Sequence, residues 1–159
     1  MNQEIIDLTQ KLLDAIAGGD WDTYTNLCDP SLTCFEPEAK GHLVHGMGFH
    51  KFYFDNKPEG SEEESAPAMN TTISSPHVRI IGESVAVISY VRLIQKMHPQ
   101  AGAIASKFEE TRVWERRDDK WIHVHLHRSR PAGEGFGRGR GGRFARWQKM
   151  RKQGRGDCK

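Results

Sequence analysis

The chain has few cysteines and none of the spacings that cysteine chemistry usually requires. Its 159 residues hold three, Cys28, Cys34 and Cys158, an odd number without a Cys-x-x-Cys pair. No apolar leader follows Met1, and no apolar run has the length of a membrane span. We therefore expect a cytosolic or nuclear protein with reduced thiols, and of the two locations we favour the cytoplasm. Cys28 and Cys34 are expected to be small buried residues, and neither a metal nor a cofactor is predicted.

Positive charge is scarce in most of the chain and concentrated at its end. Residues 1–129 contain 13 Lys/Arg against 19 Asp/Glu, whereas residues 130–159 contain 10 against 2. The last segment is rich in glycine and arginine, with one Arg-Gly-Gly at 140–142. We predict a folded domain over 1–129 and a disordered basic tail over 130–159. The tail's charge and aromatics suit RNA or an acidic surface, and a solubilising extension remains the alternative.

The first quarter of the sequence has the spacing of helices. Apolar residues recur at helical intervals over 5–16, and Gly18-Gly19 ends that pattern. Asp20 is predicted to cap a second helix over 21–28. A short strand over 32–35 and a third helical turn over 49–54 are expected to follow.

The rest of the domain has the pattern of strands. After an acidic, proline-containing loop over 57–70, strand-like segments cover 71–81, 85–97, 104–116 and 121–128, separated by turn residues. Helices followed by a long antiparallel meander predict an α+β fold, with the N-terminal helices packed on one side of a bent sheet.

Three arginines lie within the apolar rhythm of consecutive strands. Alternate residues of a strand share a face. By that count Arg92 shares a face with Ala86, Ile88, Tyr90 and Ile94. Arg112 shares a face with Phe108 and Trp114, and Arg128 shares a face with Ile122, Val124 and Leu126. A guanidinium stays charged, so it needs an acidic partner, water or an anionic guest. The pattern predicts a basic cavity. It either binds a small carboxylate or acidic peptide, or is neutralised internally by Glu110 and Glu36.

Two other constellations are weaker. His123, His125 and His127 alternate along one strand, as metal ligands can, but an exposed or interface face explains the row as well. His77 with Tyr90 could imitate an acid–base pair, yet neighbouring arginines would keep a carboxylate base ionised and weak. We therefore expect no catalytic residue.

The last strands carry more large apolar side chains than the first helix can cover. The expected contact residues are Trp114, Trp121, Val124 and Leu126. Such a leftover sheet face is typical of a dimerising surface, and the sequence predicts a homo-oligomer.

Several stretches resemble the association, or hub, domain of calcium/calmodulin-dependent protein kinase II. They are NQEIIDLTQKLLDAIAGGDWDTYTNLCDP, CFEPEAKGHLVHGMGFHKFYFDN, NTTISSPHVRIIG and EETRVWERRDDKWIHVHLHRS. The resemblance covers roughly residues 2–129. It implies a cone-shaped fold like nuclear transport factor 2, and self-assembly of dimers into a dodecameric or tetradecameric ring that clusters kinase subunits.

The resemblance also implies site residues. The family's cavity arginines fall on Arg92, Arg112 and Arg128, its pocket histidine on His77, and an aromatic of the third helix on Tyr53. The sequence has no glycine loop, strand lysine, HRD or DFG motif of a kinase. We therefore expect a non-catalytic oligomerisation hub. The alternative is a small cone-fold enzyme or anion-binding protein that uses the arginine pocket.

Overall fold

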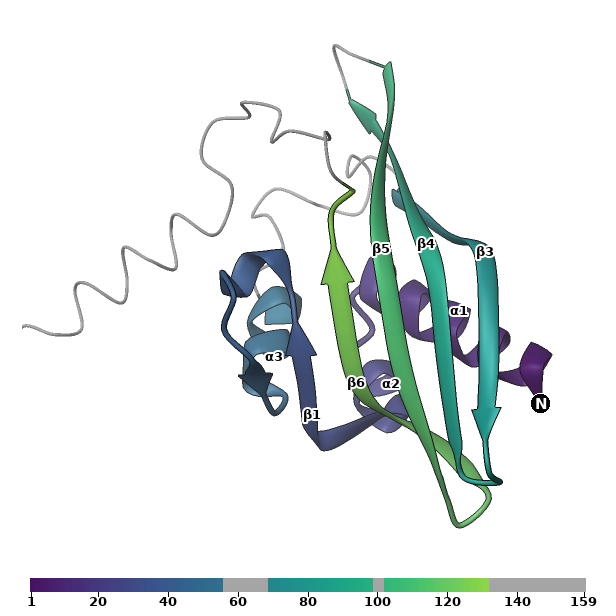
Figure 1. Cartoon of the computed structure of the whole chain (residues 1–159). Coiled ribbons are helices and arrows are strands. Elements are labelled where there is room, and N and C mark those ends of the chain that lie inside the picture. Colours follow the sequence, from purple (N-terminus) through teal and green to yellow (C-terminus); the bar gives the residue numbers. More distant parts are fainter. Residues whose placement is uncertain (56–68, 99–101, 132–159) are drawn as a thin grey trace, which may run out of the picture.

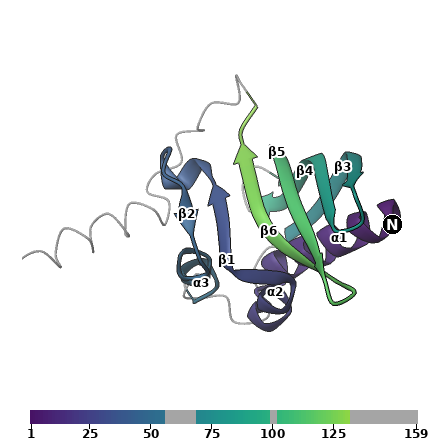
Figure 2. The ribbon, with the colours of Figure 1, turned by 60° about the horizontal axis from the view of Figure 1, so that its bottom comes forward.

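The computed structural model describes residues 1–55, 69–98 and 102–131. Its helices α1 (Asn2–Gly18), α2 (Trp21–Leu27) and α3 (Gly48–Asp55) lie on one side of a curved six-stranded sheet (Figures 1 and 2). The predicted α+β fold is confirmed. Most of the expected loop at 57–70, and all but the first two residues of the predicted tail, lie outside the described residues.

The helix boundaries follow from local capping. α1 ends at Gly19, whose left-handed backbone (φ 70°) is accessible to glycine without steric cost. The carboxylate of Asp20 then accepts a hydrogen bond from the backbone N–H of Thr23, 2.9 Å away. This bond satisfies an otherwise unpaired amide of α2. The predicted stop and cap are both confirmed.

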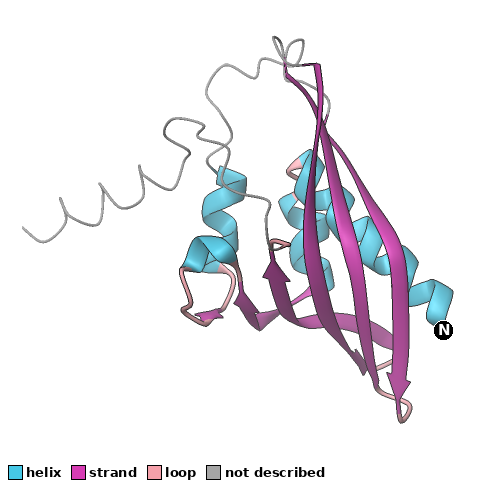
Figure 3. Ribbon diagram, turned by 45° about the horizontal axis from the view of Figure 1, so that its top comes forward, coloured by secondary structure: helices cyan, strands magenta, loops and turns pink. Residues whose placement is uncertain are grey.

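The strands, magenta in Figure 3, form one sheet in the order β2-β1-β6-β5-β4-β3, as labelled in Figure 2. Their bounds are Cys28–Phe35 for β1, Val44–His45 for β2, Met69–Ile81 for β3, Val85–His98 for β4, Gly102–Arg117 for β5 and Lys120–Ser129 for β6. The meander from β3 to β6 is antiparallel as predicted, whereas β1 runs parallel to β6. A short 3-10 turn, Pro37–Ala39, follows β1.

A bulge in β6 changes which side chains face the helices. β5 and β6 shift register between Val113 and Trp114, and Val124 is the extra residue. A bulge reverses the alternation of faces beyond it. Consequently Trp121 and His123 are buried before the bulge, and Leu126 is buried after it. The prediction that Arg128 shares its face with Ile122 and Val124 was wrong, because simple alternation does not anticipate a bulge.

The same bulge divides the histidine row. His123 is buried with no exposed surface, whereas His127 is exposed and His125 is intermediate. The three histidines therefore do not form one continuous face, and the alternating-row argument for a metal site fails.

The core lies between α1, α2 and the inner face of the sheet. Helix residues such as Leu12 and Leu13 are fully buried there, and so is Trp114. Trp121 and Leu126 are 5% exposed. We expected these three strand residues at an intermolecular surface, but their side chains are enclosed by their own chain. That expectation was wrong because α1 and α2 together cover more of the sheet than α1 alone.

The outer face of the sheet, opposite the helices, carries the remaining apolar side chains. Val87 and Val113 pair across β4 and β5, and Val91 follows on the same face. All three are only partly buried, and so is Val124. The described chain therefore leaves a central strip of valines on the outer sheet face partly open to solvent.

Candidate functional site

A cavity of about 520 Å³ lies between the inner face of the sheet and α2 and α3. Charged and aromatic side chains from helices and strands line it together with aliphatic ones. Those residues are Ile16, Tyr24, Glu36, Glu38, His50, Tyr53, Phe54, Arg92, Ile94, Lys96, Glu110, Arg112, Leu126, Arg128 and Arg130. The structure thus brings together all three arginines that strand alternation predicted, and Tyr53 lies with them.

Glu110 holds two of the arginines. Its carboxylate lies 2.9 Å from Nη2 of Arg112 and 3.5 Å from Nη1 of Arg92, and all three residues are at most 4% exposed. The Tyr90 hydroxyl donates to the same carboxylate at 2.5 Å. Burial alone would raise the pKa of Glu110, but the two guanidiniums lower it to about 2. The carboxylate is therefore ionised and a poor general base.

Arg128 is held by a second acidic pair. Its Nη2 donates to Glu36 and to Glu38, each at 2.6 Å, across the end of β1 and the turn after it. Its Nε is buried and has no hydrogen-bond partner among the described residues. One donor of this guanidinium is therefore closed to solvent and unsatisfied, and such an unmade hydrogen bond is costly.

The lining of the cavity carries charges of both signs. Its lining contains five arginine and lysine residues against three glutamates. Burial, the largest effect, lowers the pKa of His50, so the imidazole does not add to this charge at neutral pH. The internal salt bridges expected from Glu110 and Glu36 are present, and binding of an anionic guest stays a prediction.

His50 takes the place that the sequence assigned to His77. His77 is exposed, because β3 shifts register between Ser74 and His77 and turns the ring to the outer face. The expectation that His77 lines the cavity was therefore wrong. His50 is 6% exposed in α3, and its Nδ1 lies 3.1 Å from the Tyr24 hydroxyl.

His123 is a second buried histidine that sequence reasoning did not place in this region. Its Nε2 lies 3.3 Å from Nη1 of Arg112, and its Nδ1 lies 3.5 Å from Sγ of Cys28. Burial, followed by the charge of Arg112, lowers the pKa of His123 well below its usual value. The ring is neutral and accepts a hydrogen bond from the arginine.

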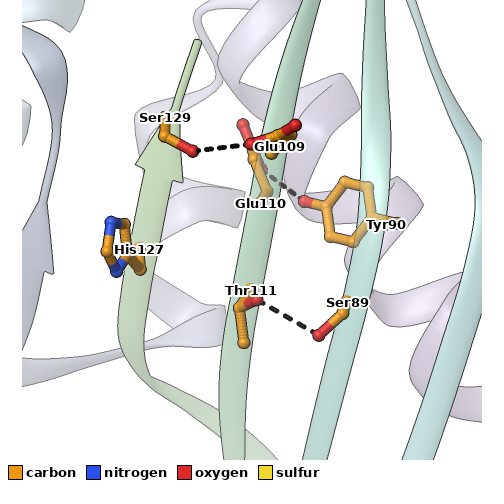
Figure 4. A pocket seen from close by; sticks show the side chains of 7 residues that line it. All are labelled: Ser89, Tyr90, Glu109, Glu110, Thr111, His127 and Ser129. Atoms are coloured by element: carbon orange, nitrogen blue, oxygen red, sulfur yellow. Dashed lines mark hydrogen bonds between the residues drawn. The ribbon is translucent and has the colours of Figure 1, made fainter. Parts of the chain in front are cut away.

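The outer face has its own depression, lined by Ser89, Tyr90, Glu109, Glu110, Thr111, His127 and Ser129 (Figure 4). Ser129 donates to Glu109 at 3.2 Å, and the Ser89 and Thr111 hydroxyls lie 3.1 Å apart. These are short polar contacts between neighbouring strands on an open face. Consecutive Glu109 and Glu110 thus serve opposite faces of the sheet.

Known proteins similar to this chain share one domain family. The calcium/calmodulin dependent protein kinase II association domain matches residues 1–132. The kinase type II alpha chain of Drosophila melanogaster is 53% identical over 122 residues, which are 77% of this chain and 22% of that protein. The delta subunit of Oryctolagus cuniculus is 50% identical with the same coverage. The chain thus spans about a fifth of the length of these relatives.

Solved structures agree with this match. The hub homology domain of Chlamydomonas reinhardtii is 50% identical with a TM-score of 0.74, covering 81% of this chain and 96% of that one. The association domain of the C. elegans kinase is 45% identical with a TM-score of 0.71, covering 80% and 93%.

A nuclear transport factor 2-like protein of Salmonella enterica shares the fold alone, at 21% identity and a TM-score of 0.62 over 87% and 96% of the two chains. No helix among the described residues is long and apolar enough to cross a membrane. The sequence match and the shared fold agree: this chain belongs to the calcium/calmodulin-dependent protein kinase II association domain family.

Proposed function

We propose that this chain is a non-catalytic oligomerisation hub, which self-assembles from dimers into a ring. The observation that carries the proposal is the match over residues 1–132 to association domains, together with about 50% identity to a solved hub homology domain. Assembly raises the local concentration of whatever is attached to it without any chemistry by the hub. Kinase subunits of the same family, in the cytoplasm, are the partners that the relatives suggest.

The partly open valine strip on the outer sheet face supports assembly. Val87, Val91 and Val113 lie side by side on β4 and β5, away from the helices. Apolar area on one sheet face is stabilised when a second copy covers it, and a two-fold contact presents the same patch on both subunits. This strip replaces the buried tryptophans as the proposed contact.

A charge placed in this strip tests the contact. Val113→Asp should shift the particle to smaller species, because burying an unpaired carboxylate in an apolar contact is strongly unfavourable. Ser84→Asp is the matched control, since it adds the same charge in the exposed β3–β4 turn. Native mass spectrometry of both variants reads the result. Equal masses for Val113→Asp and wild type would remove the strip from the interface.

A second function has its own support: the cavity binds a small carboxylate or an acidic side chain. The convergence of Arg92, Arg112 and Arg128 on one cavity favours an anionic guest, because the arginine fork matches the two oxygens of a carboxylate. This proposal concerns binding rather than catalysis, because Glu110 is held ionised between two arginines and His77 lies outside the cavity.

Ligand-observed NMR with acetate tests the second function. Acetate signals should show saturation transfer from the wild-type protein and lose it in Arg128→Ala. The control Arg79→Ala removes an exposed arginine on β3. Equal transfer in all three proteins would locate acetate elsewhere and contradict the cavity proposal.

A further inference from the structure

Three side chains of different chemistry meet at the wall of the cavity, beside the arginine network. Sγ of Cys34 lies 3.3 Å from Oε1 of Glu36 and 3.6 Å from Nε2 of His50. Oε1 of Glu36 is also 3.9 Å from Nδ1 of the same imidazole. One donor atom from each residue falls within 4.8 Å of the other two.

We propose that Cys34, Glu36 and His50 form a transition-metal site, with Zn²⁺ as the best fit. A thiolate, an imidazole nitrogen and a carboxylate oxygen are the three donor types that zinc binds in proteins. Two such ligands at tetrahedral angles lie about 3.5 Å apart, given zinc–ligand lengths of about 2.0–2.3 Å. The two sulfur distances already match this spacing.

The backbone holds the three donors in place. Cys34 and Glu36 flank Phe35 at the end of β1, so their side chains point to the same side, while Phe35 is exposed. His50 projects from α3, whose Phe54 packs against Trp21 and Tyr24 with ring centroids 5.0 Å away. A site on a strand end and a packed helix keeps its geometry without its metal.

Neighbouring groups orient two of the donors, as outer-shell partners of metal ligands do. The Tyr24 hydroxyl lies 3.1 Å from Nδ1 of His50. With its proton on Nδ1, the imidazole directs the Nε2 lone pair to the side of Cys34. Nη2 of Arg128 donates to Oε2 of Glu36 at 2.6 Å. The other oxygen, Oε1, lies next to the thiol and the imidazole and is available to a metal ion.

The protein supplies three ligands, and a fourth position faces the cavity, because Glu36 and His50 both line it. Water or a small carboxylate would complete the tetrahedron. Binding replaces the thiol proton, which passes to solvent, so the ligand set carries two negative charges against the metal's two positive ones. This inference does not depend on the hub function, and a monomeric chain would carry the same site.

Cobalt(II) in place of zinc gives a direct readout, because a thiolate-bound Co²⁺ in tetrahedral geometry has intense visible and near-ultraviolet bands. The full chain, stripped with a chelator, is titrated with Co²⁺ and then with Zn²⁺, which should displace it at one ion per subunit. We expect the thiolate band in wild type, Cys28→Ser and Cys158→Ser, and its complete loss in Cys34→Ser.

Cys28→Ser is the matched control, since Cys28 is also buried on β1 and lies near a histidine, but among the described residues its sulfur has no hydrogen bond to a carboxylate. Tyr24→Phe keeps the ring and removes the hydroxyl on His50, and should weaken Co²⁺ binding about tenfold. Absence of the band in wild-type protein, or its persistence in Cys34→Ser, would overturn the proposal whether or not the variants fold well.

Discussion

At the scale of single residues, Glu110 is the side chain on which the cavity most depends. It is 2% exposed, forms salt bridges with Arg92 and Arg112, and accepts a hydrogen bond from the Tyr90 hydroxyl. Glu110→Gln removes the charge and leaves two buried guanidiniums without a counter-ion. We expect the free energy of unfolding to fall by about 3–5 kcal/mol.

Glu109→Gln is the control for that change. It makes the same substitution one residue away, on the exposed outer face, where the carboxylate accepts from Ser129. A change within about 0.5 kcal/mol is expected there. Urea unfolding at one fixed subunit concentration compares the two. A loss for Glu110→Gln no larger than that for Glu109→Gln would show that the arginines do not depend on this carboxylate.

The same residue predicts how stability depends on pH. The pKa of Glu110 is lowered from 4.5 to about 2, so its stabilisation is complete above pH 4.5 and disappears as the pH falls through about 2. The loss is on the order of 3 kcal/mol per subunit. Urea midpoints measured from pH 7 to pH 2 should show this acid step in wild type. The step should be missing from Glu110→Gln, and its retention there would assign it to other groups.

Some of the cavity residues can be predicted from the sequence, and others cannot. The three arginines were predicted because a charge inside an apolar alternation is visible without a structure. His50 was missed because its helix is short, and no periodic pattern marks a buried histidine there. Its contacts with Tyr24 and Cys34 join residues far apart in the sequence, and only the fold brings them together.

At the scale of elements, the bulge at Val124 determines which side chains of β6 lie on the inner face of the sheet. Trp121 and His123 face inward before it, and Leu126 and Arg128 after it. Deleting Val124 removes the extra residue, so Trp121, His123, Leu126 and Arg128 become alternate residues of a regular strand and stay on one face. Since no buried side chain has to turn outward, we expect the deletion to cost less than the about 2–3 kcal/mol that exposing Leu126 alone would cost.

Val124→Ala keeps the bulge and trims one partly buried side chain, so it should cost about 1 kcal/mol or less. Thermal unfolding followed by circular dichroism compares the two variants. A much lower melting temperature for the deletion than for Val124→Ala would contradict this expectation, because it would mean that the inward-facing set does not survive the loss of the bulge.

The elements themselves were predicted well, because amphipathic spacing and turn residues mark them locally. The Asp20 cap, the Gly19 stop and the strand meander all follow from such signals. The bulges in β3 and β6 do not. Each inserts a residue that hydrophobic patterning cannot distinguish from a continuous strand, which is why His77, Ile122 and Val124 were assigned to the wrong side.

At the scale of the whole molecule, the basic tail should be dispensable for assembly. Removing residues 133–159 leaves the entire association-domain match, residues 1–132, in place. We expect the truncated chain to form particles with the same number of subunits, as measured by light scattering. Dissociation into dimers would make the tail part of an interface. Contact with RNA stays a prediction, tested by salt-dependent retention on immobilised RNA before and after truncation.

The burial of Trp114 and Trp121 changes the whole-molecule prediction that the sequence suggested. Aromatics that appeared surplus to one helix belong to the core, and partly exposed valines form the face available to another copy. Composition alone shows how much apolar surface a sheet has, but not which face the chain's own helices cover.

Native mass spectrometry of the 159-residue chain tests the central claim most directly. An oligomerisation hub built from dimers should give one dominant closed particle with an even number of 18.1-kDa subunits, about ten or more. A monomer or an isolated dimer at micromolar subunit concentration and physiological salt would contradict the hub account.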